Sequence, residues 1–177
     1  RALGNEAVKA CWYERLGNAR EVLQYGEQPT PEPQAGEVLI EVRVSGVNPS
    51  DIKARTPWLD RTAPYFPRVV PHQDGAGVIR AVGEGVSPER IGERVWFFEA
   101  QFNRASGSAA EFVSLPQDNA IRLPEDIIFE EGACLGVPAM TAHRCIFGDG
   151  EVRGKTVLVT GAAGAVGRFS VQFARQG

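Results

Sequence analysis

Hydrophobic and polar positions alternate in short runs from Ala7 to about Leu123, and turn residues separate the runs. This spacing is typical of the strands of a compact, β-rich barrel. The clearest run covers residues 37–47 and places four β-branched side chains on one face, namely Val38, Ile40, Val42 and Val44. Leu39, Glu41 and Arg43 fall on the other face, so the run predicts a strand with one buried face.

Further strands are expected over residues 75–86, 92–98 and 109–115. The first of these carries four glycines, which favours a barrel wall in which backbone passes close to backbone. Residues 29–36 contain three prolines, which lack the amide donor that a sheet interior needs, so they are expected to form a surface loop. The Pro49, Ser50, Asp51 run predicts the start of a short helix that continues to Arg55.

From Phe129 onward the pattern becomes helical, which predicts a domain boundary between residues 128 and 129. Residues 130–135 are expected to form a helix that Gly136 and Pro138 end, and residues 141–147 begin another. Residues 157–160 form an apolar run of the kind that parallel sheets bury on both faces. A glycine-rich turn and a segment with helical spacing of apolar residues follow, and this order predicts the opening of a mononucleotide-binding fold.

The turn has glycines at positions 161, 164 and 167, a G-x-x-G-x-x-G spacing instead of the more usual G-x-G-x-x-G. Glycines there let the backbone approach a pyrophosphate, and the following helix offers free amides and a partial positive charge. The motif therefore predicts a phosphate site. The alternative is that Gly164 and Gly167 serve only the close packing of the helix.

Composition narrows the choice of function. The chain has 177 residues, enough for one well-cored domain and a shorter remainder, and its net charge of -3 gives no basic surface for nucleic acid. No apolar stretch is long enough to span a membrane, and the first ten residues lack the core of a signal peptide, so a cytoplasmic protein is expected.

Residues 1–6 read as a tag remnant or cut edge. Cys11, Cys134 and Cys145 are expected to be buried free thiols.

Seven ordered sequence blocks resemble the medium-chain dehydrogenase/reductase superfamily, and within it the zinc-free NADPH:quinone oxidoreductases that include zeta-crystallin. The blocks are V-N-P-S-D at 47–51, D-G-A-G-V-I at 74–79, V-G-E-G at 82–85, G-E-R-V at 92–95, A-A-E-F at 109–112, G-V-P-A-M-T-A at 136–142 and V-L-V-T-G-A-A-G-A-V-G at 157–167. Together they run through most of the chain.

The resemblance implies a GroES-like β-barrel over residues 7–128, mainly β with short helices. The linker helices and the first β-α unit of a truncated α/β Rossmann domain would follow over residues 129–177. It also implies NADPH as cofactor, an active site in the cleft between the two parts, and a homodimer for the full-length protein. Family members continue well beyond this length, so the sequence is expected to be a fragment whose missing part holds the residues that choose NAD or NADP.

The same resemblance assigns roles to individual residues. Asn48 would lie beside the nicotinamide ribose, and Thr141 would contact the nicotinamide end of the cofactor. Gly164, Ala165 and Val166 would meet the diphosphate, with Gly161 and Gly167 completing the turn. Asp51 would order the Asn48 loop and is a candidate catalytic residue with Asn48. The alternative for Asp51 is a helix cap with no catalytic part.

Zinc-dependent members of the superfamily place cysteine where this chain has Asn48 and histidine where it has Gln73, and their third ligand position falls near Val137. Amide and aliphatic side chains are poor zinc ligands. His72 lies one residue away, which in a strand turns the side chain to the opposite face, so it is expected to be an ordinary loop or wall residue. No metal is expected.

Without a Lewis acid, hydride transfer favours quinones or conjugated carbonyl acceptors, whose developing negative charge is already delocalised. The family often has tyrosines after the Asn48 block, whereas this chain has Ile52, Lys53 and Trp58, so the acceptor stays open. Two alternatives remain. One is a non-catalytic, NADPH-binding structural or interaction protein of the same fold, and the other is a barrel that binds no nucleotide by itself.

Overall fold

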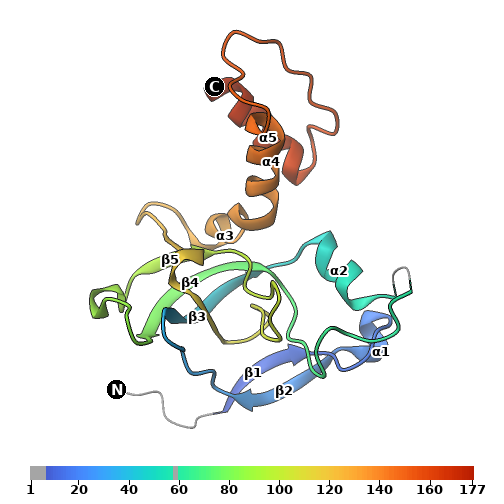
Figure 1. Ribbon diagram of the computed structural model, residues 1–177, viewed down its shortest axis with the longest axis vertical. Helices are drawn as coiled ribbons and strands as arrows, with labels where there is room; N and C mark the ends of the chain where they lie inside the picture. Colours follow the sequence, from blue (N-terminus) through green and yellow to red (C-terminus); the bar gives the residue numbers. More distant parts are fainter. Residues whose placement is uncertain (1–6, 58–59) are drawn as a thin grey trace.

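The computed structural model describes residues 7–57 and 60–177, and it has the expected β-rich architecture (Figure 1). A five-stranded antiparallel sheet has the strand order β6-β3-β4-β5-β7. Its strands are β3 (Glu37–Gly46), β4 (Asp74–Val82), β5 (Arg94–Phe97), β6 (Phe112–Pro116) and β7 (Ala120–Arg122). A second sheet pairs β1 (Ala7–Trp12) with β2 (Gln24–Pro29).

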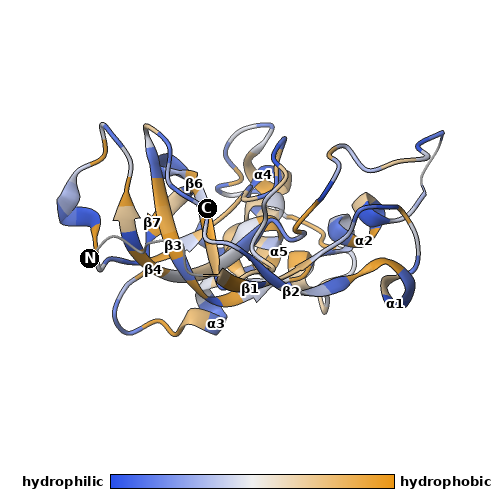
Figure 2. Cartoon of the chain, turned by 90° about the horizontal axis from the view of Figure 1, so that it is seen from below, coloured by the Kyte–Doolittle hydropathy of each residue, from blue (hydrophilic) through white to orange (hydrophobic). Residues whose placement is uncertain are grey.

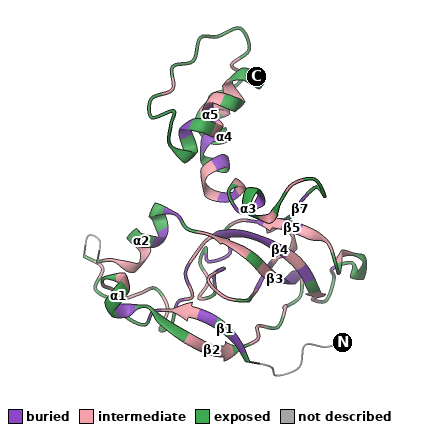
Figure 3. Ribbon diagram, turned by 180° about the vertical axis from the view of Figure 1, so that it is seen from behind, coloured by how far each residue is buried: buried purple, intermediate pink, exposed green. Residues whose placement is uncertain are grey.

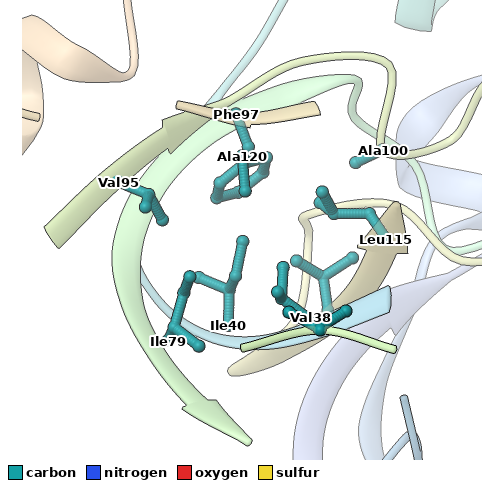
Figure 4. Close-up of a cluster of buried hydrophobic side chains, with 10 residues drawn as sticks. Val38, Ile40, Ile79, Val95, Phe97, Ala100, Leu115 and Ala120 are labelled. Atoms are coloured by element: carbon teal, nitrogen blue, oxygen red, sulfur yellow. The ribbon is translucent and has the colours of Figure 1, made fainter. Parts of the chain in front are cut away.

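The sheet curls around one hydrophobic core (Figure 4). The core consists of Val38, Ile40, Ile79, Val86, Val95, Phe97, Ala100, Val113, Leu115 and Ala120. From Ile40 to Val44, apolar and polar positions alternate as predicted, and Val38 and Ile40 are fully buried. Figure 2 shows hydrophobic stretches, in orange, in the strands of this sheet. Leu39 differs from the expectation because it is also buried, at 2% exposure, so the first half of β3 is covered on both faces.

The β1–β2 pair joins the larger sheet through the segment before β6. The Cys11 N–H donates to the Ala109 carbonyl over 2.8 Å, and the Glu111 N–H donates to the Lys9 carbonyl over 2.9 Å. Residues 109–111 therefore face β1, and the predicted strand begins at Phe112 instead of Ala109. The glycines of β4 serve close packing as expected, since a Cβ at Gly77 would collide with the Glu41 carbonyl oxygen.

Short helices lie at the ends of the barrel. They are α1 (Ala19–Val22), α2 (Pro49–Arg55) and the 3-10 turns η1 (Pro88–Arg90) and η2 (Gln117–Asn119). The helix predicted from the Pro49 run is α2, and Pro49 occupies its first position, where the missing amide hydrogen is harmless. Of the loop predicted over residues 29–36, residues 30–36 are coil and turn, whereas Pro29 is the last residue of β2.

A kinked helical linker leaves the barrel. It comprises α3 (Phe129–Gly132), the π-helical turn η3 (Leu135–Ala139) and α4 (Met140–Phe147). Ala133 packs with Ala76 and Leu123, which seats α3 on the barrel. The prediction that Pro138 ends a helix is wrong: Gly136 takes the non-helical backbone angles, and Pro138 lies inside the turn that leads into α4. The kink at Gly136 accommodates the proline ring and its missing donor.

Helix α5 (Ala165–Gln176) packs against α4 through the rings of His143, Phe147 and Phe173 (Figure 1). The strand expected over residues 157–160 is not formed, and Leu158 is 89% exposed. A strand needs a neighbour to accept and donate its ladder hydrogen bonds, and the sheets of the described part of the chain lie elsewhere. Figure 3 shows this exposed stretch as the long loop before α5.

The cysteines are free, as predicted, but they are not buried. Cys134 and Cys145 in the linker are exposed, and Cys11 in β1 is half-buried. The expectation about residues 1–6 falls outside the described residues. Among the helices of residues 7–57 and 60–177, none is long and apolar enough to cross a membrane.

Candidate functional site

A cleft of about 800 Å³ lies between the barrel, the linker and the glycine-rich turn. Three stretches of the chain line it. The barrel contributes residues 46–49 and Asp74, the linker contributes 133–134, 137–138 and 145–146, and the final segment contributes 157–161, 164–167 and 169–170. Residues that are more than a hundred positions apart, such as Asn48 and Gly164, therefore face one space.

The glycine-rich turn is open to this space. Gly161 has φ +67, a left-handed conformation that favours glycine, and no atom lies within 4 Å of the position that a Cβ would take. Gly164 precedes the first residue of α5 with an ordinary φ of -76 and is exposed. The amides of the first turn of a helix have no intrahelical acceptor, so those of residues 165–167 are available at this end of α5.

Gly167 has a different role from Gly164. It is buried, and a Cβ there would collide with the Gly161 carbonyl oxygen. At Gly164, the nearest atom to an added Cβ is the same oxygen at 3.4 Å, which is an ordinary contact. Close packing thus accounts for Gly167, whereas Gly164 has room for a side chain and packing does not require a glycine there.

Asn48 caps α2 and is buried at 8% exposure. Its backbone N–H donates to Oδ2 of Asp51 over 2.7 Å, one half of a capping box. Asp51 lies behind Asn48 and outside the cleft lining. Burial raises the pKa of the Asp51 carboxyl to about 6, the Asn48 amide opposes this rise, and the nearby Asp74 charge adds to it. The structure therefore gives Asp51 the ordering and capping position.

Asp74 is the site residue that the sequence analysis missed. It is 1% exposed, and its two carboxylate oxygens accept from the Asn48 side-chain nitrogen and from the Val137 N–H, each over 2.7 Å. Burial raises the pKa of the Asp74 carboxyl, while these donors oppose the rise. The available signal was an acidic residue at the first position of the glycine-rich strand β4, next to Gln73.

Thr141 does not line the cleft. Its hydroxyl donates to the Val137 carbonyl over 2.6 Å, so it lies one helical turn from the residue that Asp74 holds. Of the predicted cofactor residues, the structure brings together Asn48, Gly161, Gly164, Ala165, Val166 and Gly167. Thr141 remains at the edge of this group.

The positions that correspond to zinc ligands carry side chains that do not suit the metal. Asn48 and Val137 both meet Asp74, and Gln73 donates to Oε1 of Gln101 over 3.2 Å. Nδ1 of His72 lies 2.9 Å from the Ser45 hydroxyl, and burial lowers the pKa of the imidazole. Across the described residues, no group of three histidine, cysteine or acidic side chains could hold a metal ion.

Near the Asn48 loop, Ile52 is 53% exposed and extends into solvent from α2. Lys53 follows it in the last turn of the same helix. Trp58, the third residue where tyrosines were expected, lies outside the described residues.

Comparisons with known proteins agree with this architecture. The alcohol dehydrogenase GroES-like domain family matches residues 34–125. The quinone oxidoreductase of Rattus norvegicus is 37% identical over 175 residues, which are 98% of this chain and 51% of that protein. The structure of human synaptic vesicle membrane protein VAT-1 homolog-like protein matches with a TM-score of 0.84 and 30% identity, covering 97% of this chain and 53% of that one. A mycobacterial protein complexed with NADPH matches with a TM-score of 0.79 and 30% identity, covering 95% and 49%.

The chain spans about half the length of the curated relatives it matches. The matched domain nevertheless covers more than half of this chain and includes all five strands of the larger sheet. The resemblance of the seven sequence blocks to the superfamily and to its quinone oxidoreductases is confirmed, and the zinc-free subtype stays a prediction. The chain therefore belongs to the alcohol dehydrogenase GroES-like domain family, within the medium-chain dehydrogenase/reductase superfamily.

Proposed function

We propose that this chain is part of an NADPH-dependent reductase that transfers hydride to a quinone or another conjugated carbonyl compound without zinc. The observation that supports this most is the shared cleft, because it places Asn48 of the barrel opposite the glycine-rich turn before α5. The similarity to quinone oxidoreductases and to a protein complexed with NADPH adds support.

The residues of the cleft fit a dinucleotide. The open surface of the turn at Gly161 and Gly164 and the free amides of residues 165–167 suit the diphosphate, which prefers backbone donors and a helix N-terminus. Asn48 offers an amide to the nicotinamide ribose, and Thr141 stands near the nicotinamide end. When bound, NADPH supplies the hydride. The protein binds and orients it, and Asp51 keeps the Asn48 loop in place.

The same cleft suits an acceptor that needs no metal. Its lining includes apolar residues such as Val47, Pro138 and Val157, which offer apolar contact to a flat, conjugated ligand. Hydride addition to a conjugated carbonyl spreads the negative charge over the acceptor, so positioning and hydrogen bonds are enough. A simple ketone lacks this delocalisation and would need a Lewis acid or a general acid, and the side chains of Asn48, Gln73 and Val137 can neither bind a metal well nor donate an acidic proton.

The experiment follows NADPH oxidation at fixed protein concentration, with a small quinone and with an enal as acceptors. A third reaction, a simple alcohol with NADP, follows NADP reduction and tests the zinc-type reaction in reverse. We expect turnover with the quinone or the enal and none with the alcohol. Alcohol oxidation as the only activity would refute the proposal.

A second candidate function has a specific observation in its favour. The chain is also similar to a protein named for synaptic vesicle membranes, so a non-catalytic, NADPH-binding interaction protein is the alternative. NADPH binding in calorimetry without turnover of any acceptor would favour it. Absence of NADPH binding would instead favour a barrel that binds no nucleotide by itself.

A further inference from the structure

Asp74 is a buried carboxylate at the junction of the barrel and the linker. It begins β4, and its oxygens accept from one donor on each side: Nδ2 of Asn48 in the barrel and the N–H of Val137 in the linker. The Ser108 hydroxyl donates to its backbone carbonyl over 2.7 Å, which fixes the main chain as well. Both donors to the carboxylate are neutral amides.

The surrounding backbone is shaped to admit this carboxylate. A Cβ at Gly46 would collide with Oδ1 of Asp74, and a Cβ at Gly136 would collide with Cβ of Asp74. Gly46 ends β3 and Gly136 forms the kink of the linker, so a glycine stands on each side of the group. The close approach of the linker to the barrel therefore depends on this arrangement.

Stability alone does not account for Asp74. A buried charge that has no cation as partner costs free energy, and an apolar cluster in place of Asp74 and its polar partners would avoid that cost. The two groups that donate to it, however, belong to residues of the cleft wall, one in the barrel and one in the linker. Asn48 and Val137 both line the cleft, and the Val137 carbonyl accepts from Thr141.

We propose that Asp74 is a positioning residue that holds the Asn48 amide and the Val137 turn in one arrangement for the nicotinamide half of the cofactor. This inference rests on the proposed NADPH binding. A carboxylate can only accept hydrogen bonds, so it obliges Asn48 to turn its nitrogen toward Asp74 and fixes the orientation of the amide. The same carboxylate holds Val137 in the turn η3, which leads into α4 and Thr141.

The test compares two variants of the purified protein that each neutralise a buried carboxylate. Asp74→Asn changes the proposed positioning residue. Glu37→Gln is the matched control, since Glu37 is 9% exposed, accepts from Ser114 and Arg104, and lies outside the cleft lining. NADPH affinity is measured by calorimetry and the melting temperature by circular dichroism. We expect Asp74→Asn to weaken NADPH binding about tenfold, and Glu37→Gln to lower the melting temperature with affinity unchanged within about twofold.

A second variant, which exchanges the amide and the carboxylate between positions 48 and 74, keeps the test decisive if Asp74→Asn folds poorly. In the Asn48→Asp, Asp74→Asn double variant, one nitrogen again faces one carboxylate, and residue 74 still offers an oxygen to Val137. We expect the swap to recover the melting temperature and to bring NADPH affinity back to within about threefold of wild type. Recovery of the melting temperature alone, or wild-type affinity in Asp74→Asn, would overturn the positioning role.

A failure of the proposed function is distinguishable from a failure of this inference. If wild-type protein does not bind NADPH, the proposed function fails. The double-mutant cycle on unfolding would still report whether Asn48 and Asp74 are coupled. If wild type binds and Asp74→Asn binds equally well, only the positioning role fails.

Discussion

The side-chain nitrogen of Asn48 lies 2.7 Å from a carboxylate oxygen of Asp74, and the backbone nitrogen of Asn48 lies 2.7 Å from Asp51. One residue of the cleft wall is thus held by two buried carboxylates through its two different N–H groups. These two hydrogen bonds fix Asn48 in position and orientation. Its surroundings differ in kind from a zinc site, where the corresponding residue would be a thiolate ligand.

Asp51 is expected to make stability depend on pH. Burial raises its pKa to about 6 in the folded protein, above the value of 3.8 for an unperturbed group. The folded state therefore binds the proton more tightly, so this contribution to stability is complete below the unfolded pKa and is lost as pH rises through about 6.

We expect Asp51→Asn to gain about 1 kcal/mol in unfolding free energy relative to wild type on going from pH 5 to pH 8. The asparagine keeps an oxygen for the Asn48 N–H, so the cap is preserved. Urea unfolding of both proteins at the two pH values measures the difference. A gap between them that does not change with pH would contradict the raised pKa.

Alanine substitutions at two glycines of the turn are expected to differ in effect: Gly167→Ala should lower the unfolding free energy, and Gly164→Ala should weaken NADPH binding. An added methyl group at Gly167 meets the Gly161 carbonyl oxygen, so Gly167→Ala should displace the start of α5 and cost about 1–3 kcal/mol. Gly164→Ala has room and an ordinary φ, so it should leave the unfolding free energy within about 0.5 kcal/mol.

Gly164→Ala should nevertheless weaken NADPH binding about tenfold, because its methyl group would stand between the diphosphate and the amides of α5. Thermal unfolding and calorimetric titration of both variants provide the two measurements. Unchanged affinity in Gly164→Ala would show that the diphosphate does not approach this turn.

Removal of metal is expected to have no effect. Asn48, Gln73 and Val137 stand where zinc-dependent relatives would place their ligands, and none of them provides a thiolate, imidazole or carboxylate. Elemental analysis of the purified protein should find well under one equivalent of zinc, and dialysis against a chelator should leave NADPH oxidation unchanged. One tightly bound zinc per chain, with activity lost on its removal and restored by its return, would disprove the zinc-free mechanism.

Much of the fold follows from local pattern. Alternation along β3, the Pro49 helix start and the spacing of apolar residues in α5 each depend on residues within one element, so the sequence alone predicts them. The glycine turn was predictable for the same reason. Residues 157–160 show the limit of this reasoning, because a run suited to a buried strand forms one only when neighbouring strands are present.

The features that sequence reasoning missed depend on distant contacts. Asp74 gains its significance from Asn48, 26 positions before it, and from Val137, 63 positions after it. The pairing of β1 with β2, and of both with the segment at Ala109, likewise has no local signal. Cys134 and Cys145 are exposed because of how the linker leaves the barrel, which a preference for buried thiols does not capture.

The central claim is that one cleft brings the Asn48 loop and the turn before α5 to the same NADPH molecule. Its most direct test is an NMR titration of the isotope-labelled protein with NADPH, following the backbone amides and the Asn48 side-chain amide. The account predicts that the largest shifts fall on Asn48 and on residues 164–167, and that they saturate together. Shifts confined to one of these two groups, or centred elsewhere on the barrel, would contradict it.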